Sequence, residues 1–323
     1  MKTLKWGLVG CGDIAQKRVA PALRDLKTCE LHAVARLHDE LAEPFARTFG
    51  AETWYSDWHD LIQDPEIEAV YIATPVYLHA QQTIKAAQAG KHVLCEKPMA
   101  LNSKDCDRMI EACESHHVKL GIAYYRRFYP IIQRIKEILA SGEIGKPVMA
   151  DAQAFRWFDK KPGEARYWLL KKDKSGGGPM MDFGCHRIEV LQNLFGTVYN
   201  TRSDLYNLQF DREVEDTAFV SMGFDNQIHG MIRVSDAVQG NRDTLDIYAT
   251  QGTLRVPVLN QEILRVKSGS EERMERHPRH ENAHLPLIHE FTQAVFENRD
   301  PAVTGTDGKQ VSQILDEIYK QNT

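Results

Sequence analysis

The chain has 323 residues, of which 42% are hydrophobic and 26% charged, and its formal net charge is -5. This length predicts two domains, and the composition is typical of a soluble globular protein with a sizeable core. The charge argues against a strongly basic surface, so we expect neither nucleic acid nor an anionic membrane as the main partner.

The six cysteines form no C-x-x-C pair and show no repeated spacing. Thiols inside apolar runs behave as small hydrophobic side chains, which favours a reducing compartment over disulfides or a zinc site, and we expect no metal. The start, MKTLKWGLVGCG, imitates a lipoprotein signal, but its apolar run is short and Lys5 interrupts it. No run approaches the roughly 18 apolar residues of a membrane span, so we predict a cytoplasmic protein.

The first part of the chain alternates short apolar strands with longer helical patterns. Segments such as YLHAQQTIKAAQAG carry apolar residues at a spacing near 3.6 and end in glycine. This alternation predicts a doubly wound parallel sheet, of the Rossmann type, with helices on both faces. The strands are expected over residues 4–9, 30–35, 53–56, 68–74, 92–95 and 119–123.

A glycine-rich turn follows the first strand. In GLVGCGDIA, Gly10 permits a tight turn, Gly12 lets a pyrophosphate approach the backbone, and Ala15 lets the helix pack closely on the strand. A glycine turn alone is weak evidence, but its place at the first strand-to-helix turn predicts dinucleotide binding. Asp13 and Ile14 begin the helix whose N-terminus faces the phosphates, and we expect them among the cofactor contacts.

The end of the second strand indicates which dinucleotide is bound. NAD sites usually have an acidic residue there to accept hydrogen bonds from the ribose hydroxyls, whereas this chain has Arg36. A guanidinium suits a 2′-phosphate and cannot accept a hydrogen bond, and His38 is close enough in sequence to assist. We therefore expect NADP to be preferred over NAD. The alternative is that Arg36 stacks on adenine or is simply solvated.

A lysine stands at the end of a buried strand, in the segment CEKP. Burying a lysine costs several kcal/mol unless its charge is used or paired. Ligands of open α/β sheets bind beyond the carboxyl ends of the strands, so we expect Lys97 to reach the cofactor crevice. Pro98 restricts Lys97 to extended geometry. Other cofactor contacts are expected at the same edge, from Thr74, Pro75, His79 and Glu96.

After about residue 123 the pattern changes. One helix follows Pro130, another begins near the glycine run at 176–178, and residues 283–322 are helical in pattern. Short alternating strands between them predict a mostly antiparallel sheet with one face packed on helices. We predict a dinucleotide-binding domain over 1–123 and a substrate-binding and oligomerisation domain over 124–323. The expected strands of the second domain are 216–224, 227–236, 243–250 and 253–258.

The helix after the glycine run carries a polar stripe that includes Asp182, His186, Glu189 and Asn193. Such stripes are usually solvated helix faces. The preceding bare backbone of 176–178 instead suits close approach to a ligand.

Three segments, GLVGCGDIA, ATPVYLHAQQTIKAAQAGKHVLCEKPMALN and SGGGPMMDFGCH, together resemble the Gfo/Idh/MocA family of dehydrogenases. The similarity spans nearly the whole chain. It implies a Rossmann domain followed by an α/β domain whose open sheet often forms dimers or tetramers, so a homodimer or homotetramer is expected. It also implies that Lys97 touches both the nicotinamide and the substrate, and that Asp182 and His186 belong to the catalytic site.

Oxidising an alcohol requires a base for the hydroxyl proton while hydride leaves the same carbon. His186 suits this task, a nearby Lys97 would stabilise the developing alkoxide, and Asp182 could orient the imidazole or hold a substrate hydroxyl. Which of Lys97 and His186 accepts the proton stays open.

Aromatic and arginine side chains suit a sugar, which offers C–H faces and fixed hydroxyls. We expect Tyr125, Arg127, Arg156 and Trp168 to contact the substrate, together with Asp182 and His186. Tyr125 stands where the family commonly has Asn, and Trp168 is followed by Leu169 where relatives often have Arg. Each of these aromatic residues could equally be core.

The sequence thus predicts an oxidoreductase that transfers hydride between NAD(P) and a secondary alcohol or carbonyl of a sugar, cyclitol or related polyol. A glycosidase of the same fold that uses tightly held NAD would need the same Lys97 and His186. A non-catalytic dinucleotide sensor is the third reading, and the presence of both residues disfavours it.

Overall fold

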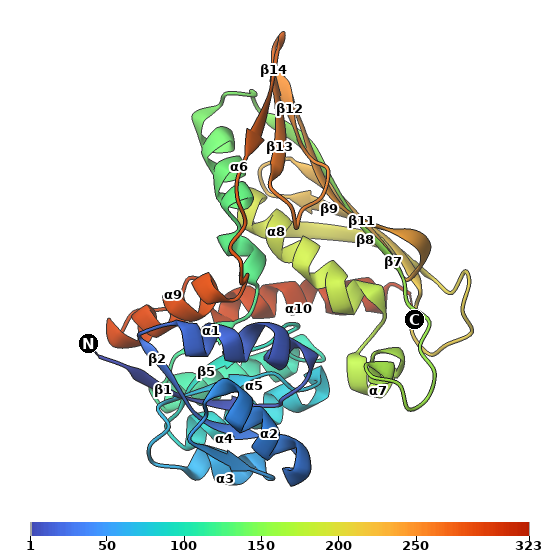
Figure 1. Cartoon of the computed structure of the whole chain (residues 1–323). Helices are drawn as coiled ribbons and strands as arrows, with labels where there is room; N and C mark the ends of the chain where they lie inside the picture. The colour runs from blue at the N-terminus through green and yellow to red at the C-terminus, as the bar shows by residue number, and fades with distance from the viewer. Residues whose placement is uncertain (1, 323) are drawn as a thin grey trace. The chain divides into compact units, whose positions relative to one another are not determined.

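The structure is a computed structural model that describes residues 2–322 (Figure 1). It contains two compact units. The first comprises the chain up to Tyr125 together with His280–Ser312, and the second comprises Arg126–Arg279 together with the residues from Gln313 onward. The expected division places everything after residue 123 in a second domain, so it differs from these units in the segment 280–312.

The first unit contains a six-stranded sheet in the order β3-β2-β1-β4-β5-β6, with every pair of neighbouring strands parallel. This confirms the predicted Rossmann sheet and the approximate position of each of its strands. The strands are β1 (Leu4–Val9), β2 (Cys29–Ala35), β3 (Thr53–Tyr55), β4 (Ala69–Ile72), β5 (His92–Cys95) and β6 (Leu120–Ile122).

Helices cover both faces of this sheet, as neighbouring residues of β1 demonstrate. Successive side chains of a strand point to opposite faces. Trp6 meets the ring of Phe291 at a centroid distance of 5.6 Å, whereas Leu61 fills the space over Gly7. The helices are α1 (Ala20–Asp25, after a π-helical turn at Ala15–Val19), α2 (Asp39–Phe49), α3 (Trp58–Gln63), α4 (His79–Gln88), α5 (Ser103–Ser115) and α9 (Leu285–Phe296).

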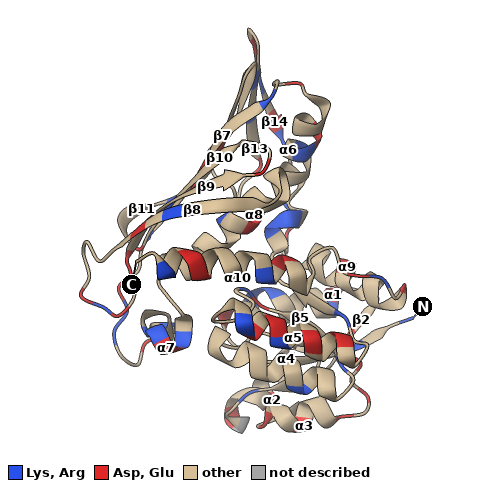
Figure 2. Ribbon diagram, turned by 180° about the vertical axis from the view of Figure 1, so that it is seen from behind, with Lys and Arg blue, Asp and Glu red and all other residues tan. Residues whose placement is uncertain are grey.

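Helix α10 (Gly305–Lys320) belongs to the first unit up to Ser312 and to the second from Gln313. Acidic and basic residues are interspersed on helices such as α5 in Figure 2, in keeping with the small net charge. Within residues 2–322, none of the helices combines the length and the apolar character that a membrane crossing requires.

The second unit contains an eight-stranded sheet in the order β14-β13-β12-β11-β7-β10-β9-β8. One pair, β7 with β10, is parallel and the others are antiparallel, which confirms the predicted mostly antiparallel sheet. The strands are β7 (Pro147–Trp157), β8 (Val198–Tyr206), β9 (Thr217–Phe224), β10 (His229–Ser235), β11 (Ala237–Ala249), β12 (Gly252–Val256), β13 (Ile263–Ser268) and β14 (Glu271–Arg276).

Two longer helices, α6 (Pro130–Ser141) and α8 (Cys185–Phe195), lie along one face of this sheet, as Figure 1 shows. The side chain of Leu191 on α8 reaches the sheet at Gly230 of β10. The shorter helical segments are Tyr167–Leu170, α7 (Lys172–Ser175) and a π-helical turn at Met180–Gly184, which continues into α8.

The glycine run before α8 is explained by packing within the second unit. A Cβ atom on Gly177 would lie 2.0 Å from the hydroxyl of Tyr319, and one on Gly178 would lie 2.0 Å from the main-chain oxygen of Glu215. The Glu215 carboxylate accepts hydrogen bonds from the N–H groups of Gly178 (2.8 Å) and Met180 (3.1 Å) and from the Tyr319 hydroxyl (2.9 Å). The close approach that these glycines permit is therefore to Glu215 and Tyr319.

We expect Gly178→Ala to lower the free energy of unfolding by about 1–3 kcal/mol, because the new methyl group overlaps main-chain atoms that cannot move aside cheaply. Urea unfolding followed by circular dichroism measures this loss. Gly184→Ala is the matched control, since its Cβ would meet the flexible side chain of Met180. Equal stability of Gly178→Ala and the wild type would contradict the packing argument.

Candidate active site

The first unit contains a turn that can hold a dinucleotide. Gly10 has φ of +95°, and a Cβ there would lie 2.8 Å from the carbonyl oxygen of Ala73. No atom lies within 4 Å of the position that a Cβ of Gly12 would take, and helix begins at the next residue. Open space in front of a helix N-terminus is what a pyrophosphate requires, so this turn fits the predicted cofactor.

The side chains that follow Gly12 are less closely tied to this space. Asp13 is exposed and its carboxylate pairs with Lys17 at 2.6 Å, and Ile14 is half-buried. Their predicted contacts with the cofactor stay predictions.

Arg36 lies beside the glycine turn. Its Nη1 donates a hydrogen bond to the carbonyl oxygen of Cys11 at 3.3 Å, and its side chain is half-buried. The side chain of His38 is 59% exposed, with Nδ1 3.7 Å from Glu40. Burial raises the pKa of the Cys11 thiol to about 12 although the charge of Arg36 lowers it, so this cysteine stays a protonated thiol.

His79 ties together the loops that follow β4 and β5. It is 1% exposed, and its ring nitrogens lie 2.8 Å from the carbonyl oxygen of Thr74 and 3.0 Å from that of Pro98. Burial lowers the pKa of His79, although the two carbonyl groups favour the protonated ring. The Thr74 hydroxyl donates to Gln82 at 2.6 Å, and Pro75 is half-buried. His79 thus shapes the edge where the cofactor is expected.

Glu96, expected among the cofactor contacts, has a carboxylate that is bound inside the first unit. The residue is 5% exposed. Its Oε1 accepts a hydrogen bond from the Tyr71 hydroxyl at 2.9 Å and lies 3.2 Å from Nε2 of His284, while its Oε2 accepts the main-chain N–H of Lys97 at 3.2 Å. Lys97 itself is half-buried, and its peptide bond to Pro98 is cis. The carboxylate therefore binds the main chain at Lys97.

Opposing effects act on the ionisation of Glu96. Burial favours the neutral acid, but the hydrogen bond and charge of His284, the charge of Lys97 and the Tyr71 hydroxyl outweigh it. Together they hold the pKa of Glu96 below its ordinary value of 4.5. Glu96 is accordingly a buried carboxylate that stays ionised near neutral pH.

His284 was not predicted from the sequence. It lies just before α9, is 1% exposed, and its ring packs against that of Tyr125 at a centroid distance of 4.6 Å. No local pattern could have pointed to it, since its partner Glu96 is 188 residues away in the chain.

In the second unit, Asp182 is bound by arginines. Its Oδ2 accepts hydrogen bonds from Arg156 at 2.9 Å and Arg166 at 3.1 Å. Arg156 also donates to Asp236 at 2.7 Å, and its guanidinium lies 4.5 Å from the centroid of Phe183. Burial favours the neutral form of Arg156, but the two aspartates outweigh it and raise its pKa. Arg156 therefore fixes the position of the Asp182 carboxylate. Its contact with a substrate stays a prediction.

His186 and Glu189 on α8 are 3% and 1% exposed. The alternative of a solvated polar stripe is therefore wrong at these positions. The Glu189 carboxylate accepts a hydrogen bond from Nε of Arg127 at 2.7 Å, which fixes the first turn after Tyr125 to α8. Arg127 thus has a structural partner in addition to its predicted contact with the substrate.

Trp168 is half-buried and packs against a small hydrophobic cluster of the second unit, together with Tyr167. At least part of its ring surface therefore serves as core. The cluster consists of Phe158, Leu169, Leu170 and Val214.

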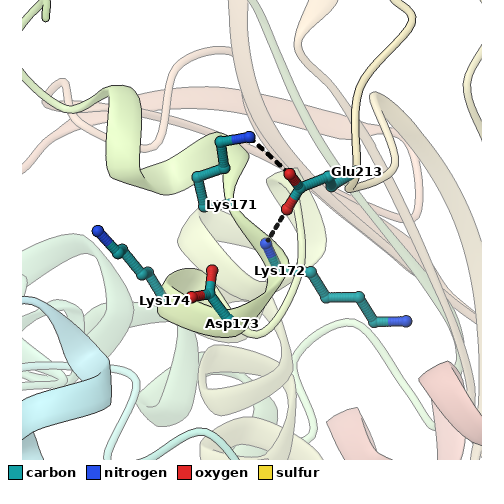
Figure 3. Close-up of a pocket in the computed structure, with 5 residues that line it drawn as sticks. All are labelled: Lys171, Lys172, Asp173, Lys174 and Glu213. Carbon is teal, nitrogen blue, oxygen red and sulfur yellow. Dashed lines mark hydrogen bonds and ion pairs between the residues drawn. The ribbon is translucent and has the colours of Figure 1, made fainter. Parts of the chain in front are cut away.

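A surface pocket of about 750 Å³ also lies in the second unit (Figure 3). Glu213 lines this pocket and accepts hydrogen bonds from Nζ of Lys171 at 2.5 Å and from the main-chain N–H of Lys172 at 3.1 Å. None of the residues predicted for catalysis or substrate binding lines this pocket. We assign no role to it.

Among the described residues, Glu30, His32 and Glu52 are close enough to share a metal ion. The ring nitrogens of His32 lie 3.1 Å from Glu52 and 3.2 Å from Asp64, so the imidazole already has an acidic neighbour on each side. The group lies toward the start of β2, away from the carboxyl end that carries Arg36. It supplies nothing to the nucleotide site.

The parallel sheet and the glycine turn define a dinucleotide-binding enzyme of the Rossmann class. Residues 4–124 match the oxidoreductase family with an NAD-binding Rossmann fold, and residues 132–255 match the GFO/IDH/MocA C-terminal domain. The chain is 31% identical over 234 residues to trans-1,2-dihydrobenzene-1,2-diol dehydrogenase of Mus musculus, covering 72% of this chain and 68% of that one. The chain belongs to the GFO/IDH/MocA family and is an NAD(P)-dependent oxidoreductase.

Two further relatives cover almost the whole chain. Myo-inositol 2-dehydrogenase of Thermotoga maritima is 27% identical over 317 residues, covering 95% of this chain and 92% of that one. The solved structure of levoglucosan dehydrogenase in complex with NADH and levoglucosan has a TM-score of 0.90 at 25% identity, covering 99% of this chain and 97% of that one. The fold is thus shared over its full length.

The ionised state of Glu96 predicts a pH dependence of stability. Because its pKa is lower in the folded than in the unfolded chain, the ionised group stabilises the fold above the unfolded value of 4.5. That contribution is lost as the pH falls through the lowered folded value. We expect Glu96→Gln to lower the free energy of unfolding by about 1–3 kcal/mol at neutral pH, and the difference to shrink below pH 4.5.

Urea unfolding of the wild type and Glu96→Gln at a series of pH values between about 3.5 and 7 measures this difference. Glu111→Gln, an exposed position on α5, is the control. A difference that stays constant across the series would mean that the pKa of Glu96 is the same in the folded and the unfolded chain.

Proposed function

We propose that this oxidoreductase interconverts a secondary alcohol and a ketone of a sugar, cyclitol or related polyol. The observation that carries the proposal is the placement of Lys97, which follows β5 at the same carboxyl edge of the sheet as the Gly10–Gly12 turn after β1. A cation at that edge, backed by an ionised carboxylate, suits the stabilisation of a developing alkoxide.

In the direction of oxidation, the O–H bond of the substrate breaks as its proton passes to a base, and the carbinol C–H bond breaks as hydride leaves. The dinucleotide, when bound, supplies the acceptor for that hydride. Lys97 and His186 are the two candidates for the base, and their assignment stays open. Asp182 is proposed to orient the imidazole of His186 or to hold a substrate hydroxyl, and its bonds to Arg156 and Arg166 support a fixed carboxylate.

The substrate class is supported by the relatives and by the side chains at hand. One relative is named for myo-inositol, and the structural neighbour was solved with levoglucosan, an anhydro-sugar. Tyr125, Arg127, Arg156 and Trp168 are proposed contacts because aromatic faces and guanidinium groups suit a ring that carries several hydroxyls.

The preference for NADP is proposed on Arg36. Its anchoring to the carbonyl of Cys11 keeps a guanidinium at the end of β2, where a 2′-phosphate would lie, and His38 is exposed two residues further on. The family description and the neighbouring structure name NAD and NADH, so NAD is the alternative.

Assembly and location are also proposals. A homodimer or homotetramer through the outer face of the eight-stranded sheet is supported by Tyr206, Phe219 and Met231, which are exposed there, and light scattering of the purified protein tests it. A cytoplasmic location is supported by the six cysteines, all of them buried thiols, and fractionation of cells tests it. The functional division into a cofactor domain over 1–123 and a substrate domain over 124–323 stays part of the proposal.

Lys97→Ala is expected to reduce kcat by about 10²–10⁴-fold, because the cation beside the developing alkoxide is lost. The measurement is a screen of sugars, inositols and their keto forms with each dinucleotide, monitored by the absorbance of the reduced nicotinamide. Lys104→Ala, an exposed position on α5, is the control.

Full turnover of Lys97→Ala on a confirmed substrate would overturn the role of the lysine. Release of a sugar from a glycoside, without net production of reduced dinucleotide, would instead identify the NAD-dependent glycosidase. Binding of the dinucleotide with no turnover of any substrate in the screen would favour the sensor.

Arg36→Glu tests the choice of cofactor. We expect kcat/KM for NADP to fall about tenfold to hundredfold, as for the loss of a hydrogen bond to a charged group, while the value for NAD is retained or rises. Arg47→Glu on α2, with an exposed side chain, is the control. Tighter binding of NADH than of NADPH by the wild type would overturn the proposed preference.

A further inference from the structure

The partners of Glu96 come from three parts of the chain. Tyr71 belongs to β4, the N–H of Lys97 follows β5, and His284 comes from the segment that rejoins the first unit after residue 279. The side chains of Tyr71 and His284 contact Oε1 of Glu96, and the main-chain N–H of Lys97 donates to Oε2. The carboxylate therefore joins His284 to the residue proposed to act on the substrate.

We propose that His284 is a positioning residue for Lys97, acting through Glu96. This rests on the proposed function, because it takes Lys97 to be the catalytic cation. His284 fixes the orientation of the Glu96 carboxylate through its hydrogen bond. The carboxylate in turn binds the main-chain N–H of Lys97 and interacts with the charge of the lysine.

Stability alone is a poor reason for this arrangement. Burying a histidine and a carboxylate removes both from water, and their mutual attraction offsets this cost only in part. Apolar residues of similar volume often stabilise a fold as much as such a pair or more. His284 also contacts Tyr125, a predicted substrate contact, through its ring face. Both of its neighbours thus lie at the edge of the sheet where the reaction is expected.

The charges around Glu96 give the histidine a second effect. The titratable groups described as acting on Glu96 or responding to it are Tyr71, His79, Cys95, Lys97 and His284. An ionised carboxylate favours the ammonium form of Lys97, which is the form that stabilises an alkoxide. Burial favours the protonated form of Glu96, and His284 opposes this effect. Without His284, Glu96 therefore becomes protonated at a higher pH.

The experiment compares His284→Leu, which removes the donor, with His284→Gln, whose amide nitrogen can occupy the place of Nε2. We expect His284→Leu to lower kcat about tenfold to hundredfold, with the dissociation constant of the dinucleotide within about threefold of the wild type. The acid limb of its kcat/KM profile moves to higher pH. His284→Gln recovers most of kcat, and His289→Leu, at an exposed position on α9, has no effect.

The outcomes separate this inference from the function on which it rests. If Lys97→Ala is inactive but His284→Leu keeps kcat within twofold, the positioning role is wrong and the function stands. If Lys97→Ala is fully active, the catalytic role of Lys97 in the proposed function is wrong, and the positioning role of His284 falls with it. Equal losses in His284→Gln and His284→Leu would overturn the role of the hydrogen bond.

Tyr71→Phe keeps the inference testable if His284→Leu does not fold. It removes the other donor to the same carboxylate oxygen with little change of shape. We expect a fall in kcat of about tenfold and the same shift of the acid limb. Full kcat and an unshifted pH profile in Tyr71→Phe would overturn the proposal.

Discussion

A carboxylate buried at the end of a strand needs partners inside the protein, because an unpaired charge removed from water costs several kcal/mol. Glu96 meets this requirement with groups from β4, from its own chain neighbour and from the segment before α9. The end of β5 is thereby held by residues far apart in sequence. The main chain at Lys97 is bound to this carboxylate through its N–H group.

In the second unit, the carboxylate of Asp182 is likewise paired with charged side chains of the protein. Arg156 binds both Asp182 and Asp236, and Arg212 also binds Asp236 at 3.1 Å. Burial raises the pKa of Asp236 although the two arginines lower it, so the arginines are what make its ionised form tolerable. In both units, a carboxylate at or beside a predicted site residue is thus held by side chains from elsewhere in the sequence.

The parts of the fold that the sequence predicts best are those with a strong local pattern. The strands of the first unit are short apolar runs because parallel strands are buried on both faces. Strand β7 was not predicted because its inward positions are Ala150, Ala152 and Ala154, and alanine gives little strand signal. Strand β14, with the sequence EERMER, was not predicted because its charged residues give no alternation of apolar and polar positions.

The candidate site follows the same rule. Gly10, Gly12 and Lys97 could be predicted as site residues because each stands shortly after the end of a strand. His284 and Glu215 could not, since each acts on a partner brought near by folding. The glycines before α8 were expected to allow close approach to a ligand, whereas the groups that the structure places against Gly177 and Gly178 are Tyr319 and Glu215.

The chain leaves the first unit after Tyr125 and returns to it at His280. The second unit is, for the most part, an insertion within the first, and the returning segment brings Phe291 to Trp6 and His284 to Glu96. A fragment that ends at Tyr125 would leave an indole and a carboxylate of the interior uncovered. In any recombination that exchanged the inserted part, both flanking pieces of the nucleotide-binding unit would have to be inherited together.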